Sequence, residues 1–145
     1  MKIVVQRVKQ ASVSIENKIY QSIDEGLLIF LGISINDTKE DIKYLAKKVI
    51  NMRIFNDDNN IMNLSIKELN LSILLISQFT LYANCKKGNR PNFIDAAPIS
   101  IAKPLYEFFI EEIKKYNLNF KAGKFGAMMN IELINNGPVT IILES

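Results

Sequence analysis

The stretch that decides the fold is Ile73-Leu74-Leu75-Ile76-Ser77-Gln78-Phe79-Thr80-Leu81-Tyr82-Ala83. Its first four residues form an unbroken apolar run, which predicts a strand buried on both faces at the centre of a sheet. A hydroxyl, an amide, a ring and a second hydroxyl follow at once, on Ser77, Gln78, Phe79 and Thr80. Polar groups at the end of a rigid buried strand often build a site. The structural alternative is that they only satisfy backbone groups or face water.

The composition indicates an ordinary globular protein. A chain of 145 residues suits one domain, 1–145, with its own core. Hydrophobic residues make up 48% and charged residues 23%, a typical balance for such a domain. No apolar run approaches the roughly 20 residues of a membrane span. The N-terminal segment turns polar too soon for a signal peptide, so we expect a cytoplasmic protein without a membrane partner.

The absence of histidine limits the chemistry that this chain can perform. It excludes a Ser-His or Cys-His nucleophile pair, an imidazole base and a histidine metal site. The single cysteine, Cys85, offers neither an internal disulfide nor a metal cluster. We therefore predict no metal and no cofactor. The formal charge of +3 permits a polyanionic partner without requiring one.

Hydrophobic periodicity predicts a single α+β domain with two main helices and a mostly antiparallel or mixed, barrel-like sheet. One helix follows the capping residues 36–38, and the second spans 98–116, with Pro104 in about its first turn and an apolar face of Ile101, Leu105, Phe108, Phe109 and Ile113. The predicted strands are 3–8, 11–16, 19–23, 26–33, 73–76, 130–134 and 139–143, and 125–129 is strand-like. Residues 53–55 are extended, 56–60 form a turn that is most simply a hairpin tip before 62–65, and a polar connector leads from 65 to 72. Residues 120–123 lead into the stretch at 125–129.

A basic loop follows the central strand. Residues 84–93 carry Lys86, Lys87 and Arg90 together with one glycine and one proline. Cations beside a polar strand end can hold phosphates, and loops of this length in small domains are often functional. A solvated surface loop explains the same residues equally well.

Two further signals are weaker. Gly137-Pro138 is predicted to lie in a tight turn over 135–138, most simply an ordinary hairpin connection. Such a bond is cis in only about 5–6% of cases, so the sequence does not establish its isomer. Gly126 and Ala127 follow Phe125, and small residues in a strand-like stretch indicate a bulge or a close approach by another group.

Across its length the chain resembles the D-aminoacyl-tRNA deacylases. The matching stretches run in order, and Ser77–Thr80 together with Gly137-Pro138 is the specific pair. The others are 4–8, 26–28 with 31–32, 53–55, 62–65, 81–83, 90–91, 125–127 with Met129, and 136–140. The departures are Asn84, Cys85 and Lys86, where the family usually has an acid, a threonine and an arginine, and they concern contacts with tRNA.

The resemblance implies an enzyme that hydrolyses the ester between a D-amino acid and the terminal adenosine of tRNA. It implies a homodimer with its site at the subunit interface, and no DNA partner. The bond between Gly137 and Pro138 would be cis and would enter the partner's pocket, where its carbonyls exclude an L-amino acid. Glycyl-tRNA, including tRNA(Ala) mischarged with glycine, would also be accepted.

The resemblance assigns catalysis to Ser77, Gln78, Phe79 and Thr80. Backbone N–H groups near Phe79 and Thr80 would stabilise the oxyanion. The Thr80 hydroxyl would orient water or the carbonyl, and Gln78 would hold the ester or the ribose. The family's proposed mechanism relies on the 2′-hydroxyl of the terminal ribose. Thr80 as a covalent nucleophile is the older alternative, and it lacks an adjacent base.

The remaining candidate residues would bind the substrate or support the Gly-Pro segment. Phe125 would stack on the terminal adenine, although a core aromatic is the simpler interpretation of the residue alone. Arg7 would donate to the carbonyls of the Gly-Pro turn, unless it is a surface cation. Room for the nucleotide would come from Gly126, Ala127 and Met129, and phosphate contacts from Lys86, Lys87 and Arg90.

Two other classes compete with this prediction. A non-catalytic, dimeric tRNA-binding module would bind tRNA without turnover. A hydrolase of small esters would have no RNA contact, and its activity would not depend on salt, whereas binding through phosphates weakens as salt rises.

Overall fold

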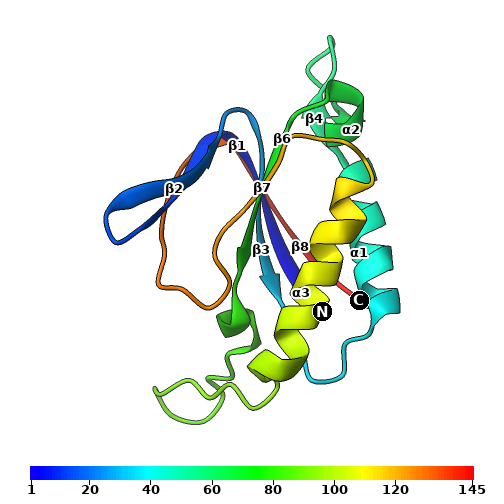
Figure 1. The fold of residues 1–145 in the computed structure, drawn as a ribbon. Helices are drawn as coiled ribbons and strands as arrows, with labels where there is room; N and C mark the ends of the chain where they lie inside the picture. The colour runs from blue at the N-terminus through cyan, green and yellow to red at the C-terminus, as the bar shows by residue number, and fades with distance from the viewer.

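The apolar run forms β6 (Ser72–Ser77), which is buried as predicted and is an interior strand of the sheet, although β3 holds the middle position. The computed structural model describes residues 1–145, and in it β6 lies between β3 (Gly26–Gly32) and β7 (Phe120–Ala122). Both neighbours run parallel to β6, whereas the other pairs of the sheet are antiparallel. The mixed sheet curls nearly into a barrel, and the predicted α+β class with two main helices is confirmed (Figure 1).

The N-terminal strand organises the rest of the sheet. β1 (Lys2–Ile15) pairs with β3 through its first half and with β2 (Lys18–Ile23) through its second half. Along its other edge it pairs with β8 (Asn130–Glu144). The prediction of two strands, 3–8 and 11–16, is wrong, because Lys9 and Gln10 stay extended within one continuous strand although both are exposed.

The segment around Gly137-Pro138 is a bulge and not the predicted turn. Gln6 pairs with Thr140 and Val8 pairs with Asn135, so Arg7 alone stands opposite residues 136–139. The two strands predicted at 130–134 and 139–143 are therefore one strand, β8, which continues through the irregularity. The Gly137-Pro138 peptide bond is cis.

Three smaller segments complete the fold: a turn, a hairpin and a short helix. Residues 125–129 form a turn, with Gly126 at φ 75°, instead of a strand. β4 (Arg53–Asn56) and β5 (Met62–Ser65) form the expected hairpin. The polar connector after it contains a short helix, α2 (Ile66–Leu69), which begins with a capping box formed by Ser65 and Glu68. Its four residues are too few to show helical periodicity in the sequence.

Two longer helices, α1 (Lys39–Asn51) and α3 (Ile99–Lys114), lie side by side on one side of the sheet (Figure 1). α1, the helix predicted after residues 36–38, buries one face formed by Ile42, Leu45, Ala46, Val49 and Ile50. The prediction for α3 is partly wrong. Its buried residues are Tyr106, Phe109 and Ile113, while Ile101 is 40% exposed and Pro104 lies in the second turn. No helix is both long and apolar enough to cross a membrane.

The start of α1 supplies a first testable prediction. The Asp41 carboxylate accepts hydrogen bonds from the Thr38 N–H (2.7 Å) and hydroxyl (2.8 Å), and these bonds lower the pKa of Asp41. A lowered pKa stabilises the fold above the ordinary value of 3.8, and this contribution is lost as the pH falls through the lowered value. We expect Asp41→Asn to lower the free energy of unfolding at neutral pH by about 0.5–1 kcal/mol.

Urea denaturation of both proteins at neutral and acid pH measures this effect. The difference should shrink as the pH is lowered below 3.8. Asp58→Asn, at the exposed tip of the β4–β5 hairpin, is the matched control and should change stability little. An Asp41→Asn deficit that persists unchanged in acid would contradict the assignment.

Candidate functional site

The chain leaves β6 at Ser77 and enters a single turn of 3-10 helix, η1 (Phe79–Tyr82). The Gln78 N–H donates to the Leu31 carbonyl (2.8 Å), which fixes this exit against β3. The Gln78 side-chain amide donates to the Thr80 hydroxyl oxygen at 2.5 Å. The amide and the hydroxyl are therefore held together at the end of the buried strand, and Phe79 beside them is 57% exposed.

A cavity of about 610 Å³ opens beside this strand end. It lies between β3, β6, α3 and the turn at 125–129, and most of its lining is apolar. Two stretches that are far apart in the sequence meet in it. From the sequence-predicted site it collects Ser77, Gln78, Phe79, Phe125, Gly126, Ala127 and Met129.

The other predicted residues do not line this cavity. Thr80 is exposed beside it, bonded to Gln78. The remaining candidates lie elsewhere, on the basic loop and around the β8 bulge: Lys86, Lys87, Arg90, Arg7, Gly137 and Pro138. The structure thus gathers seven of the candidates around one cavity, places Thr80 beside it and leaves the other six at two separate places on the same chain.

Tyr106 is the most informative lining residue that the sequence did not reveal. Its hydroxyl donates to the Leu75 carbonyl (3.3 Å), and its ring lies 5.3 Å from the Phe125 ring, centroid to centroid. Burial raises the pKa of the Tyr106 phenol above its ordinary value, so the hydroxyl stays neutral. Tyr106 precedes Phe109 and Ile113 by three and seven positions, a helical spacing that places it on their face and could have identified it.

The lining contains hydroxyl, amide and aromatic groups but no ionisable carboxylate or amine. Its polar side chains are those of Ser77, Gln78 and Tyr106. None of these is a base at neutral pH, since the Tyr106 phenol is neutral. The cavity can therefore position a substrate and donate hydrogen bonds to it, but it has no general base of its own.

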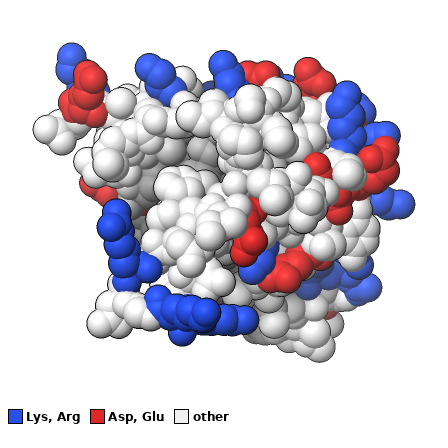
Figure 2. Space-filling view, turned by 90° about the horizontal axis from the view of Figure 1, so that it is seen from below, with Lys and Arg blue, Asp and Glu red and all other residues white.

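The basic loop folds back toward this strand end. The Phe93 ring packs edge-on against the Phe79 ring, with 5.0 Å between the centroids, and Asn84 pairs with Asn92. Lys86, Lys87 and Arg90 are exposed on the loop between them. Figure 2 shows a hollowed face with lysine and arginine side chains along one edge of the hollow.

Arg7 is buried and contacts the β8 bulge. Its Nε donates to the Asn136 carbonyl (2.9 Å), and its Nη1 donates to the Ile54 carbonyl (2.6 Å) and to Asn56 Oδ1 (3.2 Å). The alternative of a surface cation is wrong, because Arg7 is only 7% exposed. Arg7 therefore ties the residue before Gly137 to the β4–β5 hairpin.

Gly137 and Pro138 themselves are exposed. Gly137 has φ 131°, a conformation that other residues rarely adopt, and a Cβ there would lie 3.1 Å from an Arg7 nitrogen. Glycine at this position therefore permits both the bulge and its close contact with Arg7.

Comparisons with known proteins agree with this architecture. The family model described as D-Tyr-tRNA(Tyr) deacylase matches residues 4–144. A D-aminoacyl-tRNA deacylase of Thermosipho africanus is 52% identical over 145 residues, covering 100% of this chain and 97% of the relative.

Two solved structures share the fold. One, named c-Myc DNA Unwinding Element Binding Protein, has a TM-score of 0.94 and 40% identity, and the match covers 100% of this chain and 99% of the other. The second is described as a probable eukaryotic D-amino acid tRNA deacylase. Its TM-score is 0.85 at 16% identity, with 98% and 97% of the two chains covered, and it supports the fold alone.

The full-length relatives and the cavity at the end of β6 define the class of this protein as a hydrolase acting on aminoacyl-tRNA. The chain belongs to the D-Tyr-tRNA(Tyr) deacylase family. It is accordingly an enzyme that removes D-amino acids from tRNA.

Proposed function

We propose that the cavity beside β6 binds the terminal adenosine of tRNA together with its amino acid ester. The observation that carries this proposal is the meeting of the Ser77–Phe79 strand end with the turn at Phe125–Met129 around one apolar cavity. Phe125 offers an aromatic face to the adenine, a contact worth roughly 1–3 kcal/mol. Gly126 and Ala127 leave space beside that ring for the ribose.

Hydrolysis here needs positioning more than a strong nucleophile. Water adds to the ester carbonyl carbon and the bond from that carbon to the ribose oxygen breaks. The departing ribose oxygen takes the proton that the water loses and becomes a hydroxyl, and the free amino acid leaves. The first N–H groups of a helix lack acceptors within the helix, so those of Phe79 and Thr80 at the start of η1 can face the developing oxyanion. Gln78 and Thr80, which are already bonded to each other, would hold the ester or the attacking water.

A group that orients the attacking water can come from the substrate itself. The 2′-hydroxyl of the terminal ribose lies next to the ester oxygen and would orient the attacking water. Thr80 as a covalent nucleophile is less well supported, because its hydroxyl contacts the Gln78 amide, which is not a base.

Chiral selection is assigned to the exposed Gly137-Pro138 segment, acting in a homodimer. Gly137 and Pro138 are exposed, and Arg7 donates to the carbonyl of the preceding residue, Asn136. β8 pairs only with β1, and its Ile134 and Ile142 are 50% and 67% exposed, which suits a contact with a second subunit. The segment would enter the partner's cavity and exclude the side chain of an L-amino acid. Glycyl esters, including glycine mischarged on tRNA(Ala), would pass this filter in the cytoplasm.

Lys86, Lys87 and Arg90 are assigned to the phosphates of the tRNA acceptor end. They are exposed on the loop whose Phe93 packs against Phe79, a residue that lines the cavity. A positive loop beside an apolar cavity suits a substrate with a charged backbone and an aromatic terminal base.

A non-catalytic nucleic-acid-binding module is the second candidate. It is favoured by the solved structure at 40% identity, whose name describes a protein that binds a DNA unwinding element. It predicts that the chain binds tRNA or DNA and leaves the ester intact.

The test is the release of tyrosine from D-tyrosyl-tRNA and L-tyrosyl-tRNA, measured side by side at catalytic enzyme concentration. We expect the D-ester to be cleaved at least about 100-fold faster than the L-ester. Equal cleavage of both would contradict the chiral filter while keeping an esterase. Bound tRNA with no release from either ester would favour the binding module.

A further inference from the structure

The turn η1 packs directly on the last residue of β3, which is a glycine. Gly32 is buried, and a Cβ on it would lie 3.0 Å from the Gln78 carbonyl oxygen. The same Cβ would lie 3.0 Å from Leu81 Cβ and 3.4 Å from Leu81 Cδ1. Atoms that are not bonded to each other rarely approach so closely, because repulsion rises steeply below van der Waals contact. The absence of a side chain at Gly32 therefore allows η1 to lie this close to β3.

The backbone conformation of Gly32 does not itself require glycine. Gly32 pairs with Lys2 of the antiparallel strand β1, and the glycines with positive φ are Gly88, Gly126 and Gly137. Alanine can adopt the extended backbone of a strand without strain. The close contact with η1 is therefore the feature that favours glycine here, and an added methyl group would press on η1.

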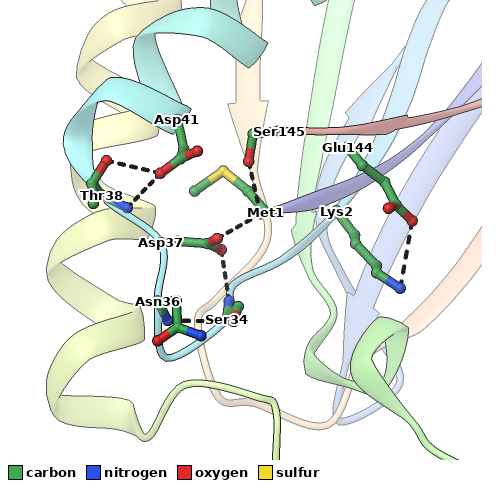
Figure 3. A network of polar contacts seen from close by, with 9 residues as sticks. All are labelled: Met1, Lys2, Ser34, Asn36, Asp37, Thr38, Asp41, Glu144 and Ser145. Atoms are coloured by element: carbon green, nitrogen blue, oxygen red, sulfur yellow. Dashed lines mark hydrogen bonds and ion pairs between the residues drawn. The ribbon is translucent and has the colours of Figure 1, made fainter.

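The end of β3 is held in place on the side away from η1. Pairing with β1 fixes Gly32 itself. Just beyond it, the Ser34 N–H donates to Asp37 Oδ2 at 2.7 Å, as Figure 3 shows. The Ala97 N–H donates to the Ile33 carbonyl at 2.9 Å. The first two residues of η1 are exposed, so η1 is the element that would move away from an added methyl group.

Both ends of the η1 turn are attached at this contact. The Gln78 N–H donates to the Leu31 carbonyl (2.8 Å), and the Gln78 carbonyl accepts the Leu81 N–H (3.3 Å). Phe79 and Thr80 lie between these attachments, and their N–H groups are the proposed donors to the oxyanion. The Gln78 carbonyl and the Phe79 N–H belong to one planar peptide unit. Displacement of this carbonyl oxygen would therefore reorient the Phe79 N–H.

We propose that Gly32 is a positioning residue for deacylation, because its missing side chain sets the direction of the Phe79 and Thr80 N–H groups. This inference rests on the proposed function, in which these groups stabilise the oxyanion. Hydrogen bonds to a developing charge depend on distance and direction, so a displacement of a few tenths of an ångström would slow the chemical step. The cavity wall at 125–129 belongs to another element, so substrate binding should change little.

The experiment compares the unmodified chain with Gly32→Ala in single-turnover hydrolysis of D-tyrosyl-tRNA. We expect the maximal rate to fall at least about 5-fold, while the half-saturating enzyme concentration changes less than about 3-fold. Asp41→Asn is the control for a loss of stability outside the cavity lining. Its maximal rate should stay within about 2-fold of that of the unmodified chain.

Backbone amide NMR of the same proteins measures the displacement without substrate. In Gly32→Ala the amide signals of Phe79 and Thr80 should shift more than that of Phe125 on the opposite wall. If Gly32→Ala does not fold, Leu81→Ala takes its place, because it loosens the same contact without adding atoms. It should also lower the maximal rate at least about 5-fold, with the half-saturating concentration little changed.

Two results would overturn this proposal and leave the deacylase function in place. One is a loss of maximal rate smaller than about 5-fold in a folded variant. The other is a slower reaction with unmoved Phe79 and Thr80 signals, since the loss would then arise elsewhere. An unmodified chain that releases no D-tyrosine would instead overturn the proposed function, and this inference with it.

Discussion

A tRNA whose terminal adenosine lacks the 2′-hydroxyl is expected to be deacylated at least about 100-fold more slowly than the normal substrate. The physical reason is that the cavity contains no ionisable base: its polar side chains are Ser77, Gln78 and the neutral Tyr106. Water attacking the ester must be oriented by another group, and the adjacent ribose hydroxyl is the nearest candidate on the substrate. The measurement is single-turnover release of D-tyrosine esterified to the 3′ oxygen of both tRNAs.

Binding and a side-chain variant separate the interpretations of that result. The affinity of the enzyme for the deoxy tRNA should change less than about 10-fold, because a single hydroxyl contributes at most one hydrogen bond between neutral groups. Thr80→Val keeps the shape of this exposed residue and removes its hydroxyl, so we expect a loss of less than about 10-fold in kcat. A Thr80→Val loss far larger than that of the deoxy substrate would instead indicate Thr80 as the nucleophile.

Replacing Gly26 by alanine is expected to lower the free energy of unfolding by about 3 kcal/mol or more. Gly26 pairs with Val8 of β1 and with Ser72 of β6, at the point where three strands meet. A Cβ at Gly26 would lie 1.9 Å from the Ser72 carbonyl oxygen and 2.7 Å from its carbon. Both are backbone atoms, which cannot rotate away, so β3 and β6 would have to separate.

Urea denaturation and expression of soluble protein measure this effect. The matched control is Gly88→Asn, in the exposed loop, where a Cβ would meet nothing within 4 Å and where asparagine tolerates the φ of 72°. We expect the control to cost less than about 1 kcal/mol. An unfolding midpoint for Gly26→Ala equal to that of the control would show that the strands can move apart at little cost.

Local pattern predicted most of the elements but not how some of them join. The apolar runs placed β3 and β6 correctly because strands buried on both faces need no alternation. Helical spacing and capping residues placed α1. Two of the failures lie at Lys9-Gln10 and at residues 135–138, where polar residues indicated breaks. Pairing along the edge of β1 keeps the backbone extended there, and no local signal reports such pairing.

Some residues of the candidate site could likewise be predicted from the sequence, and others could not. Ser77, Gln78 and Phe79 stand out in the sequence because polar groups follow a buried run. Tyr106 does not stand out, because its role depends on reaching the Leu75 carbonyl from another element. The position of Arg7 was ambiguous in the sequence, because a cation in an alternating strand can point into water or can contact a neighbouring strand. The structure shows it buried and bonded to the β8 bulge.

The sequence by itself determined the α+β class, the buried strand β6, the exclusion of histidine chemistry and, through its motifs, the family. These follow from residue types and their short-range order, which act within a few positions along the chain. Only the tertiary structure decided that the strand end and the 125–129 turn share one cavity, that Arg7 is buried under the β8 bulge, and that η1 packs on Gly32 of β3. Each of these depends on contacts between residues distant in sequence, whose formation depends on the packing of the whole chain.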